Sequence, residues 1–151
     1  MASSDSVSQL YLDSFGYGRV AVIKATPLNT AGNAVIALPL LSGGLTNANA
    51  TVGSGSVILQ KVRIQNPTGS VSSANVSITT SNDGNISNVV VANVVLTALT
   101  GAGKYQDLTI AYTANTAITG YQTSALFVNV NTASGNSNTV DIAVYGDVVS
   151  F

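Results

Sequence analysis

Residues 125–149 read ALFVNVNTASGNSNTVDIAVYGDVV, and apolar and polar side chains alternate at both ends of this stretch. The apolar series is Leu126, Val128, Val130, Val140, Ile142 and Val144. A period of two places successive side chains on opposite faces of a β-strand. The stretch therefore predicts two strands, Ala125–Asn131 and Thr139–Val149, each with one face toward a core and one face in a polar setting.

Strand-sized runs of the same kind recur between clusters of turn residues along the rest of the chain. Glu is absent and β-branched residues dominate, which favours strands over helices. The pattern predicts an all-β, antiparallel β-sandwich of about eight strands with almost no helix. The six further expected strands are Arg19–Thr26, Ala34–Leu41, Val57–Asn66, Ala74–Thr80, Val89–Leu96 and Tyr105–Thr113. The expected core comprises Val62, Ile64, Val76, Ile78, Leu108, Ile110, Leu126, Val128, Val140 and Ile142.

Three segments depart from this simple alternation. Val89–Leu96 is almost continuously apolar, which predicts burial on both faces, at the centre of a sheet or at a subunit interface. Ser42–Ser56 is long, small and polar, as in a functional or mobile loop. Residues 1–18 have a Ser-rich start and then an apolar cluster, and we expect an N-terminal extended arm there, followed by one domain over residues 19–151.

The composition is unusual because charged residues make up only 7% of the chain while hydrophobic residues reach 46%. Ser, Thr and Asn number 18, 16 and 15, so they take the place of charged residues on the surface. His, Cys and Glu are absent, which excludes a Ser-His-Asp triad, a Cys nucleophile and a zinc site of the usual kind. We therefore expect a protein that is not an enzyme, with no metal and no cofactor.

The charges give little sign of a nucleic-acid or membrane partner. The formal net charge is −1, and the basic residues are scattered along the sequence. They are Arg19, Lys24, Lys61, Arg63 and Lys104. No apolar run approaches the ~18 residues of a membrane span, and Met1–Leu10 does not resemble a standard signal peptide. We expect synthesis in a cytosol, without secretion by a signal peptide.

Several polar residues are candidate sites, but an ordinary structural role is favoured for each. Asp141 and Asp147 share one face of a strand but lie too far apart to flank one scissile bond, so solvated surface charges are expected. One carboxylate at Asp83 is a weak calcium site and favours an ordinary turn. Gly101–Lys104 lacks the spacing and the helix of a phosphate-binding loop. Lys61 and Arg63 share an outward face, where a cross-strand pair with Asp or edge protection is favoured over contact with an acidic partner.

Aromatic and apolar residues supply the candidate interface with a partner or with other copies of the chain. Tyr105, Phe127 and Tyr145 are expected to face away from the core, either as a patch or as scattered exposed residues. The cluster from Leu10 to Tyr17 should dock on its own domain or on a neighbour. The candidate interface residues are Leu10, Tyr11, Leu12, Phe15, Tyr17, Tyr105, Phe127 and Tyr145.

Several strand patterns resemble those of capsid-associated cement, decoration or head-fibre proteins of tailed bacteriophages. They are LTALT at 96–100, KYQDLT at 104–109, KVRIQN at 61–66, ALFVNV at 125–130 and VYGDV at 144–148. The resemblance covers residues 19–151 and rests on strand patterns, without a catalytic signature. It implies a jelly-roll-like sandwich that forms a homotrimer and binds the major capsid protein on the outer surface of a phage head.

With so few charges, that contact should depend weakly on salt. The resemblance places the protein in the virion after assembly in the host cytoplasm. The alternative function is a fibre or adhesin-type module that recognises a host surface glycan, with Tyr121 as an aromatic platform.

Overall fold

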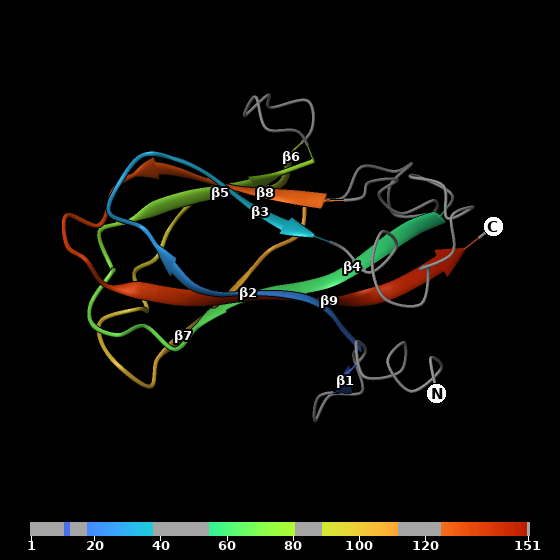
Figure 1. Cartoon of the computed structure of the whole chain (residues 1–151), viewed down its shortest axis with the longest axis horizontal. Coiled ribbons are helices and arrows are strands. Elements are labelled where there is room, and N and C mark those ends of the chain that lie inside the picture. Colours follow the sequence, from blue (N-terminus) through green and yellow to red (C-terminus); the bar gives the residue numbers. More distant parts are fainter. Residues whose placement is uncertain (1–10, 13–17, 38–54, 81–88, 112–124, 151) are drawn as a thin grey trace.

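The computed structural model describes residues 11–12, 18–37, 55–80, 89–111 and 125–150, which form two antiparallel β-sheets and no helix (Figure 1). The eight strands expected from the sequence are all present, preceded by one short strand. The strands are β1 (Tyr11–Leu12), β2 (Gly18–Pro27), β3 (Gly32–Ala37), β4 (Gly55–Gln65), β5 (Asn75–Thr79), β6 (Val89–Val95), β7 (Tyr105–Leu108), β8 (Ala125–Thr132) and β9 (Thr139–Ser150).

The two sheets lie face to face as a sandwich (Figure 1). One has the order β1-β2-β9-β4-β7 and the other the order β3-β8-β5-β6. Four strand pairs form a nested series along the chain. The innermost pair is β5·β6, and it is followed outward by β4·β7, β3·β8 and β2·β9. From β2 to β9, every connection except β5 to β6 therefore passes from one sheet to the other.

The space between the sheets holds the apolar core that the alternation predicts. Nine of the ten expected core residues are buried there, each 4% exposed or less. They are Val62, Ile64, Val76, Ile78, Leu108, Leu126, Val128, Val140 and Ile142. Ile110 is only partly buried. β7 ends at Leu108, earlier than expected, and the Ala111 amide donates to the Val90 carbonyl at 2.7 Å, in the other sheet.

The expectation that Val89–Leu96 lies at the centre of a sheet is wrong. β6 is an edge strand, and only part of it is buried. Val90 and Val91 are buried, whereas Asn93 is exposed and Val95 is 43% exposed. The apolar run predicted burial because most of its residues are hydrophobic. The position of a strand in a sheet depends instead on which strands pair with it, and β6 pairs with β5 at the edge. The alternative, that this strand lies at a subunit interface, stays a prediction.

Some expectations fall partly or wholly outside the described residues. β4 begins at Gly55, so the expected loop ends earlier than Ser56, and its other residues lie outside. The turn at Asp83 lies outside as well. Of residues 1–18, the structure describes Gly18 and β1, which pairs antiparallel with β2 through Tyr11 opposite Arg19. The extended arm stays a prediction.

Gly146 lies where β9 and β4 approach each other closely. A Cβ atom at this position would collide with the backbone carbonyl of Ile58 on β4, where no flexible side chain can move away. We expect Gly146→Ala to lower the free energy of unfolding by about 1–3 kcal/mol, as overpacking does. Urea denaturation measures this change. Gly101→Ala is the matched control, since a Cβ there meets nothing within 4 Å. Equal stability of the two variants would contradict the close approach.

Candidate functional site

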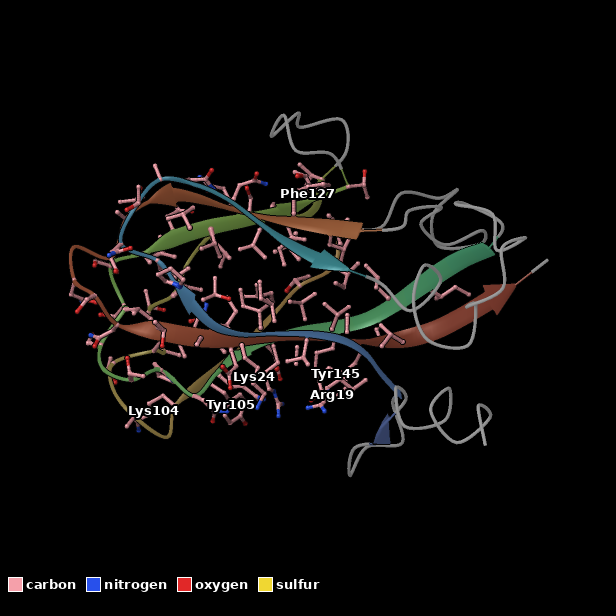
Figure 2. All side chains as sticks on the ribbon, in the orientation of Figure 1. Arg19, Lys24, Lys104, Tyr105, Phe127 and Tyr145 are labelled. Carbon is pink, nitrogen blue, oxygen red and sulfur yellow. The ribbon has the colours of Figure 1, made fainter. Side chains whose placement is uncertain are left out.

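Every charged side chain that the structure describes lies on or beside the sheet β1-β2-β9-β4-β7. Figure 2 shows Arg19, Lys24 and Lys104 on the side of this sheet that faces away from the core. The full set is Arg19, Lys24, Lys61, Arg63, Lys104, Asp107 and Asp141, and we call this surface the charged face. The basic residues are scattered in the sequence but are gathered on one side of the sandwich.

The alternation of β9 and β4 builds this face. Val140, Ile142 and Val144 point into the core, so the residues between them point outward. The register then places Tyr145 of β9 between Arg19 of β2 and Lys61 of β4. Two cations from different strands therefore flank one aromatic ring.

Arg63 and Asp107 form a bidentate ion pair across β4 and β7. Arg63 Nε donates to Asp107 Oδ1 at 2.6 Å, and Nη2 donates to Oδ2 at 2.9 Å. The two residues are direct register partners, so the expected cross-strand pair is confirmed for Arg63. The hydrogen bonds from Arg63 hold the pKa of Asp107 below its ordinary value, against the opposing effect of burial.

The two tyrosines of the charged face differ in exposure. Tyr105 is 55% exposed, and the Arg63 guanidinium lies over its ring at 4.2 Å from the centroid. Tyr145 also faces away from the core but is only 7% exposed, with Lys61 Nζ 4.6 Å from its ring centroid. The sequence predicted the direction of Tyr145. It did not predict the burial of Tyr145, because burial depends on which residues of other segments lie against the ring.

The other candidate interface residues do not join this cluster. Phe127 is half-buried and lies on the opposite side of the sandwich (Figure 2). Tyr11 and Leu12 form β1, and their side chains lie outside the described part. Leu10, Phe15 and Tyr17 lie outside the described residues. Within the described side chains, the structure thus brings together Tyr105 and Tyr145 and separates them from Phe127.

Asp141 is a structural acceptor, although the sequence predicted a solvated charge. Its side chain is 15% exposed, and it accepts the Ala25 amide at 2.9 Å and Asn66 Nδ2 at 3.0 Å. Ala25 and Asn66 both have φ of 52°, a left-handed conformation that non-glycine residues rarely adopt. Lys24 Nζ lies 3.9 Å from the same carboxylate. One carboxylate of β9 thus ties a bulged residue of β2 to the residue that follows β4. Asp147 has no described side chain.

The desolvation of Asp141 raises its pKa, but the hydrogen bonds from Asn66 and Ala25, together with Lys24, outweigh this effect. The net pKa of Asp141 is therefore lower than its ordinary value. Asp141 and Asp107 each accept two hydrogen bonds. Asp141 thereby orients Ala25 and Asn66, and Asp107 orients Arg63.

The outer face of the other sheet is neutral in the described residues. Asn131 Nδ2 donates to Ser77 Oγ at 3.1 Å and to Asn93 Oδ1 at 2.7 Å. Asn129 Nδ2 donates to Thr79 Oγ1 at 3.0 Å. These hydrogen bonds link β8 to β5 and β6. The described side chains of this face carry no charge, and we call it the neutral face.

The described residues contain no group of three or more acidic, His or Cys side chains arranged to hold a metal ion. The Gly101–Lys104 turn leads directly into β7, a strand. None of the described segments is a helix that could span a membrane. Comparisons of the chain with protein-family models, curated proteins and solved structures found no match.

We expect Asp141→Asn to destabilise the protein by about 1–3 kcal/mol, because a half-buried carboxylate that accepts two hydrogen bonds is replaced by an amide that offers one oxygen and two donors. Thermal and urea denaturation measure the change. Asp107→Asn is the matched control on the same face: the Asp107 side chain is 42% exposed, so its loss should cost about 0–1 kcal/mol. A larger loss for Asp107→Asn would contradict the role of Asp141.

The lowered pKa values of Asp107 and Asp141 also predict an acid-sensitive fold. Near pH 4 the folded protein binds fewer protons than the unfolded chain, so stability is full above about pH 5 and falls as the pH drops through the folded-state pKa values. The melting temperature, measured from pH 7 to pH 2, should fall along this acid limb. Asp141→Asn should flatten the limb. A wild-type melting temperature that is unchanged at pH 3 would contradict the prediction.

Proposed function

We propose that the protein is a non-enzymatic virion structural protein, a cement or decoration protein that binds the outer surface of a phage head as a homotrimer. The proposal starts from the resemblance of its strand patterns to those of such proteins. It also includes the finer description of the sandwich as a jelly roll.

The observation that carries the proposal is the nested strand pairing. A ribbon of eight antiparallel strands, with β5·β6 innermost and β2·β9 outermost, is rolled into two sheets. This order supports a jelly roll, an architecture frequent in viral capsid and lectin domains. The chain has no Cys, so such a particle component would not depend on disulfides during assembly in a reducing cytosol.

Self-association is supported by the apolar edge of the four-stranded sheet. Val95 is 43% exposed on edge strand β6, next to the neutral face. Burial of this residue against a second copy would remove apolar surface from water. The charged face suits such a contact poorly, because burying it would remove its cations and carboxylates from water at a cost in free energy. We therefore place the homotrimer contact on the β6 side.

Static light scattering coupled to size exclusion should give a particle of three times the 15.2 kDa chain mass. The purified protein should also co-sediment with heads of the phage that encodes it, prepared without this gene. Deletion of residues 1–18 should leave the sandwich folded, by circular dichroism, and weaken assembly or head attachment.

A monomer at micromolar concentration that ignores the heads would overturn the proposal. Binding on a glycan array by such a monomer would favour the adhesin alternative. If the truncated chain assembles and binds heads as well as the intact chain, only the proposed role of residues 1–18 is wrong.

A further inference from the structure

We propose that the charged face is a docking surface for an acidic patch on a protein partner. This proposal rests on the charge and geometry of the face and holds for any acidic protein surface. It does not require the partner to be a phage capsid.

The first argument is the distribution of charge. All five basic residues of the chain belong to the charged face, together with Asp107 and Asp141, the two carboxylates whose side chains the structure describes. The chain as a whole has a net charge of −1. The described side chains of the neutral face are Asn, Ser, Thr and apolar residues. Among the described side chains, positive charges therefore outnumber negative charges on this side, which orients an acidic partner during approach.

The second argument is preorganisation. Arg63 is held by Asp107 and lies over Tyr105, while Lys61 lies over Tyr145. Side chains that are already ordered lose less conformational entropy on binding than free ones do. Lys24 adds a cation whose side chain is 72% exposed. The face thus combines fixed cations in its middle with an accessible cation beside them.

The shape of the face selects the class of partner. Small ligands bind in concave pockets, whereas these charges lie on the outer surface of a sheet. The hollow formed by Thr26, Pro27, residues 29–32 and Val130 is lined by no charged residue. A second copy of the chain would present either the same cations or the uncharged neutral face. Duplex DNA would need many phosphate contacts, and the carboxylates of Asp107 and Asp141 would lie among them. An acidic protein patch can lie flat on this surface and carries the charge opposite to its cations.

The weak salt dependence expected from the sequence concerns the capsid contact of a chain with few charges, and it stays a prediction. A contact made by the charged face, in contrast, is mainly ionic. Its strength should fall steeply as salt shortens the range of electrostatic attraction.

The test uses immobilised poly-L-glutamate as the acidic polypeptide probe, with biolayer interferometry on the full chain. We expect binding at 50 mM NaCl that is about tenfold weaker at 500 mM. Lys61→Gln and Lys104→Gln should each weaken it about threefold, as expected for the loss of one exposed ion pair. Asp107→Asn should strengthen it, because it removes a negative charge from the face.

Asn93→Asp is the matched control: it lowers the net charge by the same amount as Lys61→Gln, but on the neutral face. It should leave the affinity unchanged. Circular dichroism checks that each variant is folded, and Lys104→Gln, which lies outside the strands, decides the matter if Lys61→Gln does not fold.

Three results would overturn the proposal. They are no binding of poly-L-glutamate at 50 mM NaCl, equal weakening by Asn93→Asp and Lys104→Gln, or tighter binding of a DNA duplex than of poly-L-glutamate. None of them bears on head binding through another surface, so this inference and the proposed function fail separately.

Discussion

The rest of the structure depends on the alternation of β9, the strand at the centre of the five-stranded sheet. Its inward residues Val140, Ile142 and Val144 are fully buried, and its outward residues include Asp141 and Tyr145. β2 and β4 pair with its two sides, so a shift of one residue would exchange the core and the charged face. The same register that packs the core therefore brings Arg19 and Lys61 to Tyr145, and Asn66 and Ala25 to Asp141.

Asparagine side chains hold the loops of this protein together through hydrogen bonds to the backbone. Asn136 Nδ2 and Asn138 Nδ2 both donate to the Ser70 carbonyl, at 2.8 and 3.1 Å, and thereby join two loops at one end of the sandwich. Gly69 lies so close to the Asn138 amide that a Cβ atom would collide with it. Short neutral amides can satisfy backbone groups in close quarters without the desolvation cost of a charge. This explains how a sandwich with 7% charged residues can close its loops.

The two outer faces divide the surface into two kinds of chemistry. The charged face combines cations, carboxylates and tyrosines, and the neutral face combines amides and hydroxyls that bond to one another. Ionic contacts are selective for partners of opposite charge. The proposed contact between copies lies on the other side, at the exposed Val95 of β6. The two proposals therefore use different sides of the sandwich. With separate contact surfaces, one molecule can bind other copies of the chain and an acidic partner at the same time.

The sequence by itself determined the strands and the core, because a period of two is a local property that each segment carries alone. It also determined that Tyr105 and Tyr145 face outward and that Arg63 is suited to a pair with Asp. Only the tertiary structure decided that β6 lies at an edge, that Lys61 lies over Tyr145 and that Asp141 holds Ala25 and Asn66. Each of these features depends on which strands become neighbours and in which register. Asp141 is 116 residues from Ala25 along the chain, and no local pattern encodes a partner at that distance.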